Sequence, residues 1–403
     1  MNEFISRRKF ITSGTLALSS LAMVDMPAFA SIISKENKVR VALVGVGQRG
    51  LGLANLLKKT AGTELIACCD IVDKNLQNGI AVAAPKAKAY KDFHSLLKNK
   101  DVDAVIIATP LNLHYQMVMD ALSAGKHVYV EKTMTYDIPQ AVALVNRMKT
   151  SKLVLQVGHQ YRYYAMYHKI KEMISNNWLG TVTAFESQYN RNSDWRRPVS
   201  DPKLERQVNW RMYKEYSGGL LAELCAHQID VVNWMLDDHP IKVTGLGGIN
   251  HWKDGRETYD HVHTIYEYQK GIKSNVTSIL SNEHNGYAMR ILGTKASIVI
   301  EREKAFIYPE KTLKNYGTVD GVTGATIESI KKGQGMPIEY ISQDGLNLDP
   351  TAYALLDFAD CIRNNKKPFS NVETGRDAAI AVHMGNQTID TGNVQFWKPE
   401  YSI

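Results

Sequence analysis

The first half of the chain alternates short apolar runs with segments of helical periodicity. The apolar runs have the length of buried strands, and each is followed by a polar turn or an amphipathic stretch. The runs are 38–44, 63–70, 102–110, 126–132 and 153–159, and the clearest helical stretches are 51–61, 114–125 and 138–152. This alternation predicts a doubly wound parallel sheet, with ligands gathering at the carboxyl ends of its strands.

Beyond residue 155 the pattern changes to strand-rich sequence broken by turns. The strand-like segments are 181–190, 241–250, 261–269, 272–281, 287–301 and 304–310. Such a series favours a mainly antiparallel sheet. A glycine pair leads into a helical stretch that ends at 236, and residues 350–391 turn helical again. We therefore expect an α/β protein whose second domain is of the α+β class.

A glycine-rich turn joins the first predicted strand to the first predicted helix. It reads Gly45-Val46-Gly47-Gln48-Arg49-Gly50, and Asp70 ends the next strand twenty residues later. Gly45 permits a tight turn, Gly47 lets the backbone approach a pyrophosphate, and Gly50 lets helix and strand pack closely. The helix N-terminus offers unpaired N–H groups to the phosphates. The context predicts a Rossmann dinucleotide-binding domain.

Asp70 bears on the choice of dinucleotide. Its carboxylate would accept hydrogen bonds from a ribose diol and would repel a 2′-phosphate, so it favours NAD. Arg49 and Lys74 are candidate phosphate partners, which keeps NADP possible.

The chain opens with the pattern of an export signal. Arg7 and Arg8 precede an apolar stretch over 11–23, and Ala28-Phe29-Ala30 fits a small-x-small cleavage site. The arginine pair followed by Phe10 resembles a twin-arginine signal, which implies a periplasmic protein exported folded with its cofactor. An ordinary secretory signal is the alternative. Residues 1–35 are therefore set apart as signal peptide and linker, and no membrane span is expected in the mature chain.

Charge, cysteine and histidine content argue against three kinds of feature: a nucleic-acid interface, a disulfide framework and a metal site. The formal net charge is +7, but no dense basic block with interleaved aromatics occurs, so nucleic-acid binding is not expected. Cys68, Cys69, Cys225 and Cys361 lack zinc-finger spacing and are expected to be buried hydrophobes, without a disulfide framework. His261 and His263 alternate on a strand, but no third ligand is evident, so we expect no metal site.

Three motifs in order give the chain a family resemblance. "ATPLNLHY" (108–115) is followed one strand later by "VEKT" (130–133), and then by a segment of the form GG…H…D (218–230). Together with the glycine-rich turn and Asp70, they resemble the Gfo/Idh/MocA oxidoreductases. The resemblance implies a Rossmann domain over 36–158 and an open-faced, mainly antiparallel α+β domain over 159–403. The open sheet face often mediates assembly in this family, so a homodimer or homotetramer is expected.

The resemblance also assigns cofactor and catalytic residues. The implied cofactor-binding residues are Gly45, Gly47, Gln48, Arg49, Gly50, Asp70, Thr109, Pro110, Asn112, His114, Glu131 and Lys132. Lys132 is also a catalytic candidate, since a partly desolvated lysine has a lowered pKa. Relatives usually have proline where this chain has Thr133, which puts the local turn geometry in doubt.

The second catalytic group lies on the helical stretch after the glycine pair. Glu223 and His227 are four residues apart and are expected on one helix face. The family pattern has aspartate at the first position and a histidine base at the second. Here Glu223 replaces the aspartate and His227 is the candidate base. Asp230 is expected to pair structurally nearby.

A polyol substrate needs hydroxyl-bonding groups and aromatic platforms. Three segments supply them, and the substrate-binding candidates are His159, Tyr161, Arg162, Arg191, Trp195, Trp210 and Arg211. We expect an enzyme that oxidises a ring hydroxyl of a sugar or glycoside by hydride transfer, with a tightly bound NAD(P) recycled in place. Two alternatives stay open: a glycoside hydrolase that uses transient oxidation and elimination, and a noncatalytic sensor.

Overall fold

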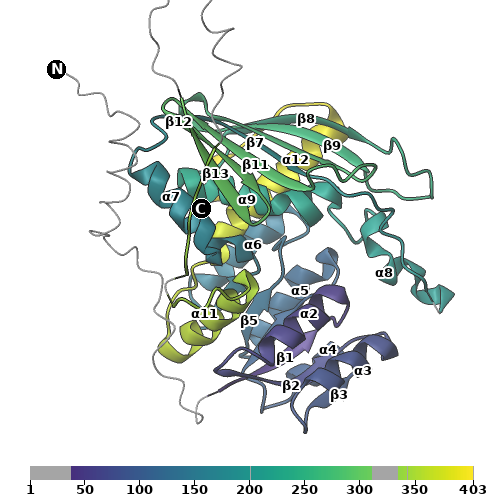
Figure 1. The fold of residues 1–403 in the computed structure, drawn as a ribbon. Coiled ribbons are helices and arrows are strands. Elements are labelled where there is room, and N and C mark those ends of the chain that lie inside the picture. Colours follow the sequence, from purple (N-terminus) through teal and green to yellow (C-terminus); the bar gives the residue numbers. More distant parts are fainter. Residues whose placement is uncertain (1–37, 200, 311–334, 343, 403) are drawn as a thin grey trace, which may run out of the picture.

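The computed structural model describes residues 38–199, 201–310, 335–342 and 344–402 (Figure 1). The predicted signal peptide and linker, residues 1–35, lie outside the described residues. Two sheets organise the described part, one in each half of the chain.

The first half forms the expected parallel sheet, with strand order β3-β2-β1-β4-β5-β6. The strands are β1 (Val39–Val44), β2 (Thr63–Cys69), β3 (Lys88–Tyr90), β4 (Ala104–Ile107), β5 (His127–Val130) and β6 (Leu155–Val157). The helices between them are α2 (Gln48–Leu57), α3 (Asp73–Val82), α4 (Phe93–Leu97), α5 (His114–Ser123) and α6 (Ile138–Met148). The strand order reverses between β1 and β4, which is where a doubly wound sheet opens its ligand crevice.

The second half forms a nine-stranded sheet, with order β14-β13-β12-β11-β7-β10-β9-β8-β15. Its strands are β7 (Val182–Tyr189), β8 (Lys242–Gly248), β9 (His261–Glu267), β10 (Lys273–Ile279), β11 (Tyr287–Gly293), β12 (Ala296–Glu301), β13 (Lys304–Pro309), β14 (Met336–Pro337) and β15 (Gln395–Phe396). All neighbours are antiparallel except β7 and β10, which pair in parallel. The expectation of a mainly antiparallel second sheet is confirmed.

Helices cover one face of this sheet. α7 (Ala165–Ser175), α9 (Ala226–Leu236) and α12 (Val372–Thr391) lie together on that side (Figure 1). β9 shows the resulting alternation, because Val262 and Tyr266 are buried whereas Ile265 is 46% exposed. On the neighbouring strand, Leu246 is 78% exposed. The opposite face of the sheet is therefore open in the described part of the chain.

The helical region expected at 350–391 is two helices with different partners. α12 packs on α6, α9 and β8, whereas α11 (Pro350–Asn364) returns to the first half and contacts α2 and β1. Leu355 and Phe358 of α11 share a buried cluster with Leu43 and Leu53. The boundary expected between 158 and 159 falls just after β6, and α11 crosses back over it.

The cysteines lie as their sequence context indicated. All four are free and buried. Cys68 and Cys69 point into separate apolar clusters on the two faces of β2, because successive strand residues face opposite ways. Within the described ranges, no helix is both long enough and apolar enough to span a membrane.

The glycine-rich turn offers a test of the fold with a control in the same helix. A Cβ on Gly50 would stand 1.9 Å from the carbonyl oxygen of Gly45, whereas a Cβ on Gly52 would meet nothing within 4 Å. We expect Gly50→Ala to lower the free energy of unfolding by about 1–3 kcal/mol because the backbone must shift. Gly52→Ala should raise it by roughly 0.5–1 kcal/mol, since alanine is the better helix former. Urea unfolding of both variants checks this, and equal stability of Gly50→Ala and the parent would contradict it.

Candidate active site

The glycine-rich turn has the shape that a dinucleotide requires. Gly45 has φ +81°, a conformation that favours glycine, and its carbonyl lies against Gly50. A Cβ on Gly47 would point into open space, so the backbone there is accessible to a ligand. α2 begins at the next residue, Gln48. The residues present therefore fit a pyrophosphate at the helix N-terminus.

Asp70 lies beside this turn at the end of β2. Its carboxylate accepts hydrogen bonds from the backbone N–H of Val46 at 2.6 Å and of Val72 at 2.8 Å. These bonds fix the carboxylate between the turn and the start of α3. The contact of Asp70 with the ribose of the dinucleotide stays a prediction.

Lys132 joins the two halves of the molecule. It follows β5, and its Nζ donates to the carbonyl oxygens of Ala222 at 3.1 Å and Glu223 at 2.6 Å. The hydroxyl of Thr133 donates to the same Ala222 carbonyl at 3.1 Å, and the Lys132–Thr133 peptide is cis. Burial lowers the pKa of Lys132, and the nearby cation of Arg211 lowers it further, against the opposing effect of Glu223.

The acceptors for Lys132 come from an irregular helical turn. Residues Leu221–Cys225 form a π-helical turn that leads directly into α9. A π turn closes i→i+5 hydrogen bonds, so this segment departs from the regular α-helix expected there. Glu223 lies in the π turn and accepts from Nε of Arg211 at 2.7 Å. The expectation that Glu223 and His227 share one helix face stays a prediction.

His227 is buried at the first turn of α9, with 8% of its surface exposed. Its ring packs against Tyr161, with centroids 4.7 Å apart. Burial holds the pKa of His227 well below 6.5, and the positive charge of Lys132 adds to the effect. Nδ1 is buried without a hydrogen-bond partner among the described residues. His227 is therefore a neutral imidazole that lies within electrostatic range of the Lys132 amine.

Below His227, a buried ion pair supports the site. Nε of Arg162 lies 3.0 and 2.9 Å from the two carboxylate oxygens of Asp230, and Arg162 Nη2 lies 2.9 Å from one of them. His159 Nδ1 is 3.8 Å from the same carboxylate. Burial lowers the pKa of His159. Since Asp230 occupies the Arg162 guanidinium, the geometry assigns Arg162 a supporting position rather than the substrate contact expected from sequence.

His114 ties two strand ends together. Its Nδ1 lies 2.9 Å from the carbonyl oxygen of Thr133 and its Nε2 lies 3.1 Å from that of Thr109. Pro110 begins the short turn that leads into α5, and the N–H of Asn112 donates to Tyr216. This cluster connects the ends of β4 and β5 to the second half of the chain.

Arg49 and Glu131 form a further pair near the turn. Nε of Arg49 donates to Glu131 Oε1 at 2.7 Å, and the Glu131 side chain is 8% exposed. Nη2 of Arg49 is buried without a partner among the described residues. Arg49 thus remains a candidate for the cofactor phosphates, with one donor group unused.

A tyrosine-lined cavity of about 1020 Å³ adjoins this region. Arg49, Tyr161 and Arg191 line it, and Arg191 lies over the ring of Tyr189. The cavity brings together residues that the sequence pattern did not select: Tyr164, Tyr167, Tyr189, Tyr287 and Tyr340. The only sequence signal for them is the high tyrosine content, because their positions depend on the packing of α7 against β7 and β11.

The remaining substrate candidates lie apart from this cavity. Arg211 is held by Glu223 and stacks on Trp210, with 4.3 Å from its guanidinium carbon to the ring centre. Trp195 is half-buried against the core, with φ +62°. The structure therefore brings Arg211 to Glu223 but does not bring Trp195 to His227 through any contact among the described residues.

The two histidines of β9, His261 and His263, lie in different surroundings. His261 Nδ1 lies 2.8 Å from Asp260, and its Nε2 lies 3.1 Å from the Ser281 hydroxyl. His263 is exposed on the open sheet face. Across the described ranges, no group of three or more His, Cys, Asp or Glu residues has the arrangement of a metal site.

Comparison with known proteins agrees with this geometry. Residues 39–159 match the profile of an oxidoreductase family with an NAD-binding Rossmann fold, and residues 167–299 match that of the GFO/IDH/MocA C-terminal domain. The fold, the glycine-rich turn and the two profile matches together define an NAD-binding oxidoreductase. The chain belongs to the Gfo/Idh/MocA family.

Several relatives of this chain are inositol dehydrogenases. The scyllo-inositol 2-dehydrogenase (NAD(+)) of Bacillus subtilis is 26% identical over 87% of this chain and 93% of its own length. An inositol 2-dehydrogenase/D-chiro-inositol 3-dehydrogenase of Lactiplantibacillus plantarum is 27% identical, but the match spans only 51% of this chain and 55% of that enzyme.

Solved structures share the fold at lower identity. Aldose-aldose oxidoreductase from Caulobacter crescentus aligns with a TM-score of 0.71 and 18% identity, over 89% of this chain and 100% of that one. A levoglucosan dehydrogenase in complex with NADH and levoglucosan aligns with a TM-score of 0.69 and 19% identity, over 89% and 99%.

The buried ion pair below His227 can be tested for stability. Asp230→Asn leaves the Arg162 guanidinium buried without a counter-charge, so we expect the free energy of unfolding to fall by about 3–5 kcal/mol. Asp237→Asn at the end of α9 is the matched control, because the Asp237 side chain is 74% exposed and its pair with Lys171 should be worth about 1 kcal/mol or less. Urea unfolding measures both, and similar losses in the two variants would argue against a structural role for Asp230.

Proposed function

We propose that this protein oxidises a ring hydroxyl of a sugar, polyol or glycoside, with NAD as the hydride acceptor. The observation that carries the proposal is the contact of Lys132 Nζ with the π turn that leads to His227. It holds a cation and a neutral imidazole at the same crevice as the dinucleotide turn. Alcohol oxidation needs these two groups, a base for the hydroxyl proton and a cation for the developing alkoxide.

The roles follow from the surroundings of each group. His227 accepts the hydroxyl proton, because burial keeps its ring neutral. Lys132 stabilises the substrate oxygen as it becomes a carbonyl oxygen. Glu223, fixed by Arg211, bonds a neighbouring hydroxyl. Bound NAD supplies the hydride chemistry, and the protein supplies orientation and charge.

The substrate class is a polyhydroxylated ring. Tyrosine rings and hydroxyls in the neighbouring cavity, with Arg191 at its wall, combine the apolar faces and hydrogen-bonding groups that sugars need. The named relatives support this assignment, since the Bacillus subtilis enzyme is an inositol dehydrogenase and a structural neighbour was solved with levoglucosan.

The location of the protein and the fate of its cofactor belong to the same proposal. The twin-arginine signal expected at residues 1–35 exports the protein folded, with NAD already bound, to the periplasm. A second sugar or another acceptor then reoxidises the cofactor in place, because the periplasm offers no pool of soluble NAD.

The proposed assembly is a homodimer or homotetramer built on the open face of the second sheet. This face presents apolar side chains to solvent, with Leu246 78% and Ile265 46% exposed. A second copy of the chain would bury them.

The proposed reaction is tested on protein purified without added nucleotide. Sugars, polyols and glycosides are added in turn, and we expect one of them to convert bound NAD to NADH, seen by its fluorescence. Lys132→Met should retain NAD but lose turnover about 100-fold or more. Lys149→Met, an exposed lysine after α6, is the control. Unchanged turnover in Lys132→Met would exclude the catalytic role, and glycoside cleavage that leaves NAD oxidised would point to the hydrolase instead.

The role of His227 is tested through pH. Because burial depresses its pKa, the imidazole stays neutral below pH 6.5, where an ordinary histidine is already protonated. We therefore expect kcat/KM of the parent to hold through pH 6.5 on acidification and to fall only at lower pH. His227→Ala should lose about 100-fold or more, with partial recovery at high pH as hydroxide replaces the base. Parent-like rates in the variant would refute the assignment.

A further inference from the structure

One loop of the second half reaches across to the dinucleotide turn. This crossing loop, residues 190–199, follows β7, and Nη2 of Arg197 donates to the side-chain oxygen of Gln48 at 2.6 Å. Gln48 is the first residue of α2 and directly follows Gly47. The Arg197 guanidinium is thereby placed at the helix end where a dinucleotide pyrophosphate binds.

The backbone of Arg197 is held in place by a single side chain. Oδ1 of Asn209 accepts from the Arg197 N–H at 2.7 Å, and Nδ2 of Asn209 donates to the Arg197 carbonyl at 3.1 Å. Asn209 is 2% exposed, and its Nδ2 also lies 3.0 Å from Glu205. Arg197 therefore extends from a fixed point rather than from a free loop.

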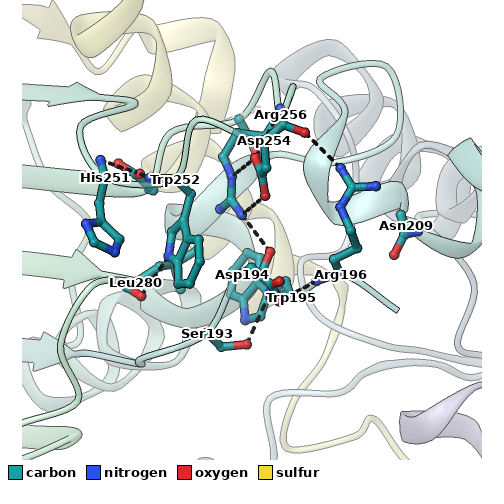
Figure 2. Close-up of polar contacts among 12 residues, drawn as sticks. Ser193, Asp194, Trp195, Arg196, Asn209, His251, Trp252, Asp254, Arg256 and Leu280 are labelled. Carbon is teal, nitrogen blue, oxygen red and sulfur yellow. Dashed lines mark hydrogen bonds and ion pairs between the residues drawn. The ribbon is translucent and has the colours of Figure 1, made fainter. Parts of the chain in front are cut away.

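The rest of the crossing loop is anchored to the second half. Figure 2 shows Arg256 joining the carboxylate of Asp254 and the carbonyl oxygen of Asp194, at 2.8 and 2.6 Å from Nη2. The Arg256 side chain is 1% exposed. The same view shows Arg196, whose backbone N–H donates to Asp194 and whose Nη2 donates to the Asp254 carbonyl.

Two adjacent arginines of this loop differ in one respect that matters for an anion. Arg196 Nη1 lies 2.8 Å from Glu205, so its charge is neutralised. Arg197 has no carboxylate within 4.0 Å among the described residues, its side chain is exposed, and its one side-chain partner is the neutral Gln48. A guanidinium left unneutralised beside phosphate-binding N–H groups is a donor suited to an anion.

We propose that Arg197 binds the pyrophosphate of NAD and, with Asn209 as its positioning residue, clamps the cofactor between the two halves of the chain. Cofactor release then requires the crossing loop to move, so the clamp slows dissociation. The proposal rests on NAD binding by the Rossmann half and is independent of which sugar the enzyme oxidises.

Binding of NADH and of ADP-ribose to the full-length protein tests the clamp without any substrate. Both probes carry the pyrophosphate, and only NADH carries nicotinamide. We expect Arg197→Gln to raise the Kd of each about 10- to 100-fold, as for loss of one charge-assisted contact, and to speed NADH release. Arg197→Lys should recover part of the affinity. Lys203→Gln removes an exposed cation outside the crossing loop. It is the control and should stay within about threefold of the parent.

Combining Asn209→Ala with Arg197→Gln separates positioning from general damage. Asn209→Ala alone should weaken NADH binding, but it should add little when Arg197 is already replaced, since both changes remove the same contact. An unchanged Kd in Arg197→Gln would overturn the proposal. So would a rise in the sugar KM without any change in NADH or ADP-ribose binding, because Arg197 would then face the substrate.

Discussion

The contact of Lys132 with the π turn is the constraint on which the rest of the site depends. A lysine ammonium out of water needs acceptors, and a regular α-helix leaves few carbonyl oxygens free in its interior. The π turn at Leu221–Cys225 presents two of them, from Ala222 and Glu223, to Nζ. One cation therefore fixes the end of β5 in the first half against the start of α9 in the second. His227 lies two residues beyond the turn, and its ring packs against Tyr161.

The charges around Lys132 are arranged so that no carboxylate neutralises it directly. Each acidic side chain nearby has its own arginine: Glu131 has Arg49, Glu223 has Arg211 and Asp230 has Arg162. Lys132 is left with neutral carbonyl acceptors, and burial together with nearby cations lowers its pKa. Burial lowers the pKa of His227, and the charges of Lys132, His159 and Arg49 add to this effect. The arginine–carboxylate pairs thus leave Lys132 without a direct carboxylate partner among the described residues, while burial keeps the His227 imidazole neutral.

The features that could be predicted from the sequence are those that a short local pattern determines. Strand–helix alternation and the spacing from Gly45 to Asp70 are short-range features, and the parallel sheet and its glycine-rich turn are confirmed. The edge strand β3 was missed because two of its three residues are exposed and give no apolar signal. The π turn at Leu221–Cys225 was not predicted, because a regular α-helical period was assumed there. Its carbonyl oxygens accept from Lys132, about ninety residues earlier in the chain, and no window around Glu223 contains that contact.

Arg162 and Arg197 show the same limit for side-chain roles. Both are arginines near aromatic residues, but the sequence pattern selected Arg162 as a substrate contact and did not select Arg197. Arg162 pairs with Asp230 because η3 (Gln160–Tyr163) lies against α9. This ion pair neutralises the charge of the Arg162 guanidinium. Arg197 extends from the crossing loop to Gln48 and meets no carboxylate among the described residues. Whether an arginine supports a site or binds a ligand is thus decided by the nearest acidic group in three dimensions, which composition and spacing do not encode.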